Sequence, residues 1–161
     1  MAAEAALKEG AQVSIYDAMP SVARKFLMAG KSGLNISHSE EEKLFRSRYR
    51  APDARLDGLI AAFGPGDVER WMNGLGIESF RGSSGRVFPV MMKASPLLRA
   101  WLARLRTSGA RLHVRHRWQG WDEAGALVFA TPEGEVRLEA DSVILALGGA
   151  SWSRLGSDGA W

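Results

Sequence analysis

The side chain whose placement most directly suggests chemistry is Asp17. It closes a segment of alternating character over residues 12–18, which predicts a β-strand, and a predicted helix over residues 2–9 precedes it and ends at Gly10. A carboxylate at the carboxyl end of such a strand can accept hydrogen bonds from both hydroxyls of an adenosine ribose. The alternative is that Asp17 only meets water at the end of its strand.

A second group of candidates lies in and after a predicted helix over residues 22–28. Its glycines would expose backbone N–H groups and its cations would balance negative charge, so the segment could surround a pyrophosphate or the edge of a flavin. A flexible basic loop without a ligand is the alternative. The candidates are Arg24, Lys25, Gly30, Lys31, Gly33 and Asn35, with His38 as a further hydrogen-bond donor.

Paired glycines follow the most apolar segment of the chain. Residues 142–147 (SVILAL) are typical of a strand in the buried middle of a parallel sheet, and Gly148 and Gly149 come directly after it. Open α/β sheets bind ligands outside the carboxyl ends of their strands, and missing side chains let a ligand approach the backbone. Asp158, between two further glycines, could serve as a polar ligand or cap a helix.

Several absences narrow the chemistry. The 161 residues include no cysteine, which excludes disulfides, cysteine-bound zinc, iron–sulfur centres and thiol redox chemistry, so redox work would need a cofactor. No hydrolase signature, zinc-protease motif or Walker lysine occurs, and we predict no metal site. The sequence has neither a leader nor an apolar run of bilayer length, so we expect a cytoplasmic protein without a membrane partner.

Mixed helices and strands must position these residues. Residues 40–75 predict two or three helices, broken near residues 51–52 and 63–66. The other predicted elements are a hairpin of residues 77–80 and 86–90, a helix opened by Ser95 and Pro96 and closed by Gly109, an edge strand over residues 111–118, and a meander of residues 126–130 and 135–139.

The order helix, glycine, strand and terminal acid is that of the second half of a nucleotide-binding βαβ unit. In such a unit the ribose acid lies roughly 20 residues after a glycine-rich phosphate loop. Asp17 is too close to Met1 for this, and the chain contains no GxGxxG. The missing strand would lie between the Asp17 strand and the strand over residues 142–147, so we expect a gap in the middle of the sheet, with two apolar edges exposed.

Three blocks of sequence resemble one family. They are residues 24–35 (RKFLMAGKSGLN) with Ser37 and His38, residues 85–89 (GRVFP) with 92–99 (MKASPLLR), and residues 146–152 (ALGGASW) with 154–161 (RLGSDGAW). Together they are similar to the bacterial FAD-dependent oxidoreductases of the BaiN/YhiN type, also labelled aminoacetone-oxidase-like. The resemblance covers nearly the whole chain but only the N-terminal part of the family.

The resemblance has consequences for fold and cofactor. It implies FAD, with its adenosine ribose on Asp17, its phosphates partly on Arg24 and Lys25, and its flavin end near residues 31–35. The expected fold is α/β: an incomplete Rossmann-like FAD-binding domain, with a parallel sheet and a β-meander, plus a small helical insertion. We expect a partial FAD-binding domain over residues 1–39, the insertion with its hairpin over 40–93, and the continued FAD-binding domain over 94–161.

The chain also departs from the family pattern. Members usually begin with a strand and a glycine-rich loop, which this sequence lacks. Ala23 and Ser32 stand where glycine is usual, and Ser153 stands where proline is expected. Because the phosphate-binding loop is missing, we expect this chain alone to bind FAD poorly, to be marginally stable and to be inactive.

The resemblance implies an oxidoreductase that passes electrons between a bound flavin and a small organic substrate, with NAD(P)H or dioxygen as the second partner. Lys31 near the flavin could stabilise its reduced, anionic form. The residues identify no catalytic acid or base, and they leave the substrate and the oligomeric state open.

Two other classes of function compete with this interpretation. Residues 79–121 contain nine Arg or Lys and no Asp or Glu, which favours an anionic partner such as a nucleic acid. That stretch lacks interleaved exposed aromatic residues for base stacking, which makes a nucleic-acid partner the weaker interpretation. The other alternative is a flavoprotein-like domain retained for structure or for binding a partner.

Overall fold

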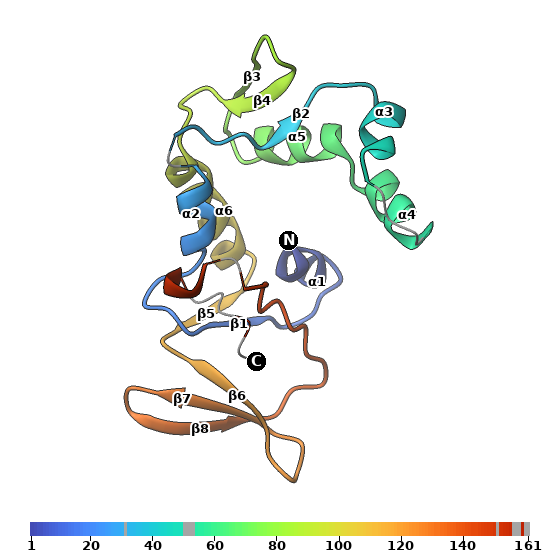
Figure 1. Ribbon diagram of the computed structural model, residues 1–161. Coiled ribbons are helices and arrows are strands. Elements are labelled where there is room, and N and C mark those ends of the chain that lie inside the picture. The colour runs from blue at the N-terminus through green and yellow to red at the C-terminus, as the bar shows by residue number, and fades with distance from the viewer. Residues whose placement is uncertain (31, 50–53, 151, 156–158, 160–161) are drawn as a thin grey trace. The chain divides into compact units, whose positions relative to one another are not determined.

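The computed structural model describes residues 1–30, 32–49, 54–150, 152–155 and 159. The chain forms two compact units (Figure 1). Unit 1 consists of Met1–Lys25 and Ala103–Trp161, and unit 2 consists of Phe26–Leu102. The division falls inside two helices, α2 (Arg24–Ala29) and α6 (Ala94–Thr107). No helix in the described ranges is both long and apolar enough to cross a bilayer.

Unit 1 begins with the predicted helix and strand. Helix α1 (Ala2–Lys8) ends just before Gly10, whose φ of +82° suits glycine and turns the chain. Strand β1 (Ser14–Asp17) pairs in parallel with β5 (Arg111–Val114), in a register that sets Tyr16 beside His113 and Asp17 beside Val114. Both predicted elements are confirmed, and the parallel pairing confirms the α/β class.

The predicted strand over residues 111–118 is wrong in one respect, because the chain turns a corner within it. Arg115 has a φ of +58°, and the strand divides into β5 and β6 (Arg117–Trp121). At the corner the N–H groups of Arg115 and His116 donate to the carbonyls of Met19 and Asp17, each at 3.0 Å. These two bonds replace the ladder bonds of a continuous strand, so the corner costs no hydrogen bond.

The predicted meander is confirmed. Strands β6, β7 (Leu127–Thr131) and β8 (Gly134–Leu138) form an antiparallel sheet in the order β6-β7-β8. Leu127 and Phe129 of the middle strand are buried, 8% and 5% exposed, and alternate with more exposed neighbours. This period of two gives β7 one buried face.

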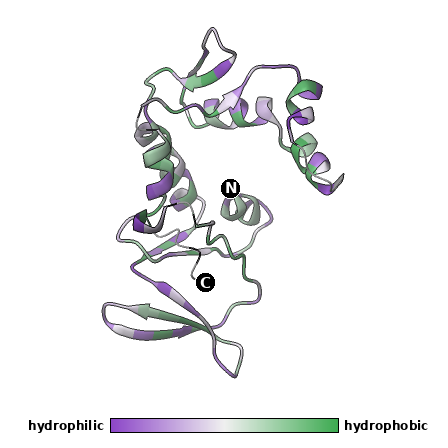
Figure 2. Ribbon diagram, viewed as in Figure 1, coloured by the Kyte–Doolittle hydropathy of each residue, from purple (hydrophilic) through white to green (hydrophobic). Residues whose placement is uncertain are grey.

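The predicted central strand over residues 142–147 is wrong. The segment is hydrophobic (Figure 2), yet it forms no strand, and Val143, Ile144 and Leu145 are 41%, 66% and 50% exposed. A strand needs a neighbour for its N–H and C=O groups, and within the described residues the parallel sheet contains only β1 and β5. Within the described residues, the edge of β1 away from β5 has no strand beside it.

Unit 2 contains the predicted helices α3 (Glu42–Ser47), α4 (Ala54–Ala62) and α5 (Pro65–Asn73). The predicted break near residues 63–66 is confirmed: Gly64 caps α5, Pro65 is its first residue, and the Gly64 N–H donates to Oδ2 of Asp67 at 2.9 Å. The other predicted break, near residues 51–52, lies outside the described residues.

Unit 2 also contains a small antiparallel sheet in the order β2-β4-β3. The predicted hairpin is confirmed as β3 (Ser79–Arg81) and β4 (Arg86–Pro89), with Phe80 opposite Phe88 and their rings stacked at 5.6 Å. Strand β2 (Ser37–His38) pairs with β4 and was not predicted, because two residues are too few to show a hydropathy pattern.

The core of unit 2 lies around the first half of α6. Leu97 and Met72 are fully buried, and Leu34 and Ala94 pack with them. Within this unit the rings of Trp71 and Trp101 meet edge to face at 5.0 Å. Helix α6 begins one residue before the predicted cap, Ser95, which leaves Pro96 in the first turn, where its missing N–H costs nothing.

Candidate functional site

Asp17 lies at the carboxyl end of a parallel strand, as the sequence predicted. Its carboxylate oxygen Oδ1 accepts a hydrogen bond from the N–H of Met19 at 2.8 Å, which closes a local turn. No partner of Oδ2 occurs among the described residues. Because a carboxylate oxygen has two lone pairs, Asp17 can hold this turn and still accept hydrogen bonds from both hydroxyls of a ribose.

The two glycines after residues 142–147 differ in what the structure requires of them. Gly148 has a φ of +78°, a conformation that favours glycine. A Cβ built on Gly149 would meet no heavy atom within 4 Å, so packing does not explain this glycine. Asp158, the other candidate of this region, lies outside the described residues.

Arg24 and Lys25 open helix α2, Arg24 half-buried and Lys25 exposed. Neither forms an ion pair within the described part of the chain. Both cations therefore remain available to balance the charge of a ligand.

Ala23, directly before α2, has a φ of +57°, which is strained for a residue with a side chain. Ala23 is the position where the family resemblance leads us to expect glycine. Ala23→Gly is expected to raise the free energy of unfolding by about 1 kcal/mol, because the left-handed conformation costs an L-residue about that much. Urea denaturation followed by tryptophan fluorescence measures the change.

Ser32 supplies the matched control for that substitution. It also stands where glycine is usual, but its φ is not in the left-handed region. Ser32→Gly is expected to lower the free energy of unfolding by about 0.4–1 kcal/mol through the greater freedom of the unfolded chain. Equal effects of both substitutions would contradict the argument from backbone strain.

At two glycines of the loop predicted to lie near the flavin, the structure leaves little room for a side chain. A Cβ on buried Gly30 would lie 2.5 Å from the Cβ of Ala94. Gly33 has a φ of +136°, and a Cβ there would lie 2.9 Å from Cε of Met92. The N–H of Leu34 donates to the carbonyl of Met92 at 3.0 Å. The loop is thus anchored to residues 92–94, and packing alone accounts for both glycines.

The remaining candidates of this loop are Asn35 and Lys31. Asn35 is exposed, and its N–H donates to the carbonyl of Gly33 at 3.0 Å. An exposed amide can reach a ligand without losing a buried contact. Lys31 lies outside the described residues.

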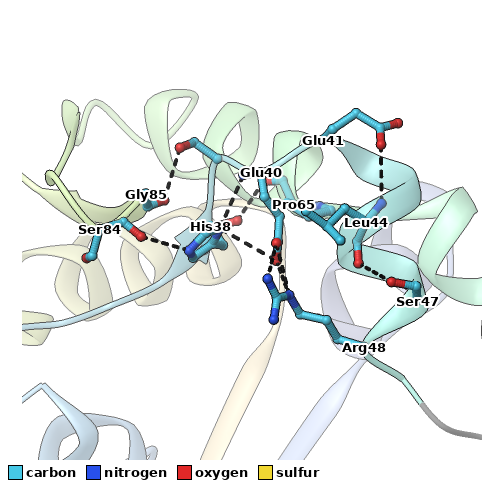
Figure 3. A network of polar contacts seen from close by, with 11 residues as sticks. His38, Glu40, Glu41, Leu44, Ser47, Arg48, Pro65, Ser84 and Gly85 are labelled. Atoms are coloured by element: carbon cyan, nitrogen blue, oxygen red, sulfur yellow. Dashed lines mark hydrogen bonds and ion pairs between the residues drawn. The ribbon is translucent and has the colours of Figure 1, made fainter.

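His38 joins β2 to the turn of the β3–β4 hairpin (Figure 3). Its Nδ1 accepts from the N–H of Glu40 at 3.2 Å, and its Nε2 lies 3.1 Å from the carbonyl of Ser84, to which it must donate. The carbonyl of Ser84 can only accept, so Nε2 carries a hydrogen. A Cβ on Gly85 would lie 2.7 Å from Cε1 of this ring. His38 is therefore a structural contact, with no ring nitrogen left for a ligand.

Glu40 extends the same network. Its carboxylate accepts from the Arg48 guanidinium, with Oε2 at 2.6 Å from NH2, and this hydrogen bond is the main reason why the pKa of Glu40 is lowered. Ser39 adds a hydrogen bond from Oγ to the carbonyl of Gly85 at 3.0 Å. The sequence did not predict this network, because the positions of its polar residues along the chain match no known motif.

The basic stretch over residues 79–121 meets acids from elsewhere in the chain. Arg81 pairs with Glu69 at 3.3 Å in unit 2, and Arg104 pairs with Glu4 at 2.6 Å in unit 1. These pairs offset part of the positive charge that suggested a nucleic-acid partner. Among the residues that the structure describes, no three potential metal ligands lie together.

Comparisons with known proteins identify the family of the fold. The family model described as HI0933-like protein Rossmann domain matches residues 1–161. The chain is 27% identical over 150 residues to the 3-dehydro-bile acid delta(4,6)-reductase of Clostridium scindens, covering 92% of this chain and 36% of that protein. The crystal structure of Thermovibrio ammonificans THI4 has a TM-score of 0.57 at 14% identity, covering 91% of this chain and 52% of that one. The chain spans about a third to a half of the length of these two proteins, and it belongs to the HI0933-like family through its Rossmann domain.

Proposed function

We propose that this chain binds FAD, weakly on its own, and belongs to an oxidoreductase that passes electrons between the flavin and a small organic substrate. The observation that carries the proposal is Asp17, at the carboxyl end of parallel strand β1 with one carboxylate oxygen unpartnered among the described residues. In a Rossmann fold an acid at this position binds the ribose of a dinucleotide. The match over residues 1–161 to a Rossmann family supports the proposal.

The residues of unit 1 fit the adenosine half of such a cofactor. Asp17 would accept the ribose hydroxyls, Gly149 would leave space for the ligand against the backbone, and the cations of Arg24 and Lys25 would balance pyrophosphate charge. Asn35, which is exposed, and Lys31 remain the predictions from sequence for the flavin end. When bound, the flavin supplies the two-electron chemistry, and the protein orients it.

The second electron partner follows from the same proposal. The Clostridium scindens relative is named as a reductase. We propose the same direction here, with electrons passing from NAD(P)H through the flavin to the organic substrate, and with dioxygen as the alternative partner.

Replacement of Asp17 by asparagine tests the proposal. Asparagine can still accept the N–H of Met19 and keep the turn, but it loses the charge and one acceptor oxygen. FAD affinity is expected to fall about tenfold, because hydrogen bonds to charged groups contribute about 1.5–3 kcal/mol. Titration of the full chain with FAD, followed by flavin fluorescence, measures this ratio.

Asp122 provides the matched control. Its Oδ1 also closes a local turn, accepting from the N–H groups of Ala124 and Ala126 at 3.0 and 2.9 Å. Asp122→Asn makes the same change of charge at a position without a predicted cofactor role, and it should leave FAD affinity unchanged. Equal affinity of Asp17→Asn and the unsubstituted chain would refute the assignment of Asp17.

A further inference from the structure

Four aromatic rings pack together, centred on Tyr16, the residue before Asp17 in β1. The Tyr16 ring stacks on His113 at 4.5 Å with an interplanar angle of 11°, and on Phe129 at 4.7 Å with an angle of 28°. His116 lies 5.5 Å from Tyr16 and 6.1 Å from Phe129, so it touches the same group. These rings join β1 and β5 to the meander strand β7 within unit 1.

The backbone beside the rings holds Asp17 directly. The N–H of His116 donates to the carbonyl of Asp17, and the N–H of Arg115 donates to the carbonyl of Met19, both at 3.0 Å. The side chain of Asp17 in turn accepts from Met19. The corner after β5 therefore fixes the backbone on both sides of the turn that orients the carboxylate.

The hydrogen bond of His116 defines its proton. Its Nδ1 lies 2.8 Å from the carbonyl of Val114, which can only accept, so Nδ1 carries a hydrogen. This bond, together with that of the backbone N–H, sets the His116 ring against Tyr16. His116 thus makes two contacts: its backbone N–H bonds the carbonyl of Asp17, and its ring lies against Tyr16.

We infer that Tyr16, His113, His116 and Phe129 form a proton-sensitive clasp that positions Asp17 for the ribose hydroxyls. The inference rests on the proposed function, because it assigns Asp17 to the ribose. None of the four residues touches the cofactor in this proposal. They are positioning residues. Phe129 is the one that lies in the meander, so the meander supports the site through this ring.

The groups around His113 favour its uncharged form, and this is the form in which the clasp is intact. Burial lowers the pKa of His113, and the positive charges of His116 and Arg111 lower it further. The ionisable groups shown next to His113 are Arg111 and His116, which act on its pKa, and Tyr16, whose ring stacks on it. The adjoining elements also carry Arg115 at the corner, Arg117 on β6 and Asp17 on β1. Strand β7 (Leu127–Thr131) has no ionisable side chain. No described carboxylate forms an ion pair with His113.

The sign of the pH dependence follows. The unfolded chain binds the His113 proton more tightly than the folded chain, so protonation favours unfolding of the clasp. Its contribution to stability is present above the ordinary histidine pKa of about 6.5 and is lost as the pH falls through the lower, folded value. Binding of ribose at Asp17 should weaken over the same range.

ADP-ribose is a suitable probe because it contains the adenosine ribose and pyrophosphate but no flavin. Calorimetric titration of the full chain at pH 7.5 and pH 5.5 is expected to show a loss of affinity at the lower pH, where part of His113 is protonated. His113→Phe keeps a ring for Tyr16 to stack on but cannot take a proton, so its affinity should be the same at both pH values. His113→Gln serves the same purpose if the phenylalanine variant does not fold.

Three further variants separate positioning from a general loss of structure. Phe129→Leu removes one stacked ring and should weaken ADP-ribose binding at pH 7.5, whereas Leu127→Val, also buried on β7 but outside the ring cluster, should not. His38→Gln, in unit 2, should leave the pH dependence in place.

Each outcome decides the inference. Equal affinity of the unsubstituted chain at both pH values, or a persistent fall in His113→Phe, overturns the clasp. If FAD binds as proposed while ADP-ribose binding is indifferent to Phe129→Leu, the clasp fails and the proposed function stands. If neither ligand binds at pH 7.5, the proposed function fails and the positioning role falls with it. Melting temperatures at the two pH values then still show whether His113 makes the clasp sensitive to protons.

Discussion

Replacing Leu97 by alanine is expected to lower the free energy of unfolding by about 2–5 kcal/mol, the largest effect of any substitution proposed for this chain. Leu97 is 0% exposed and lies in a cluster with Leu34, Met72 and Ala94. Alanine would lose the transfer free energy of the removed carbons and leave a cavity that fixed neighbours cannot close. Urea denaturation reports the change through Trp71 and Trp101, whose rings lie in the same unit.

Leu59 is the control for this prediction. It is also a leucine within a helix, α4, but 67% exposed. Leu59→Ala should change the free energy of unfolding by no more than about 0.5 kcal/mol, as is usual for surface positions. Similar effects at both positions would show that the cluster around Leu97 is not the core of unit 2.

Gly30→Ala is expected to lower the free energy of unfolding by about 1–3 kcal/mol, the usual cost of overfilling a packed site. The new Cβ would lie 2.5 Å from the Cβ of Ala94 and 3.1 and 3.3 Å from its backbone N and Cα. Backbone atoms cannot move aside as the end of a side chain can, so the loop or helix α6 must shift. Chemical denaturation measures the loss, and Ala94→Gly in the same chain should restore part of it.

Gly58→Ala tests whether the loss at Gly30 comes from the close contact. Gly58 lies in helix α4, and a Cβ there would meet nothing within 4 Å. Its replacement should stabilise the chain by up to about 1 kcal/mol, since alanine is the better helix former. If Gly30→Ala lowered FAD affinity and left stability unchanged, Gly30 would serve the ligand rather than the packing.

The elements with strong local signals could be predicted from sequence. Alternation predicted β1, the turn residues of the meander predicted β7, the glycine and proline positions predicted the start of α5, and Asp17 was expected at the end of its strand. The family match over residues 1–161 confirms the resemblance of the three sequence blocks to one family. These features depend on residues that are close in sequence, or on motifs that do not depend on spatial context.

What sequence could not predict depends on neighbours in space. Residues 142–147 have the composition of a buried strand, but a strand forms only beside another strand, and within the described residues none lies alongside. The alternation over residues 111–118 gave no sign of the corner at Arg115, because its hydrogen-bond partners, Asp17 and Met19, are distant in sequence. The alternation places His113 and His116 on opposite faces of one strand, so their contacts with the same Tyr16 ring were not predicted.

The unpaired residues 142–147 also bear on how the protein behaves at high concentration. Six successive residues without charge or proline, rich in Val, Ile and Leu, have the composition of segments that stack between chains into cross-β fibrils. Exposure of Ile144 and Leu145 leaves this segment accessible to other copies. Unless a neighbouring strand covers it, the solubility limit of the protein will be set by these six residues rather than by its net charge of +3.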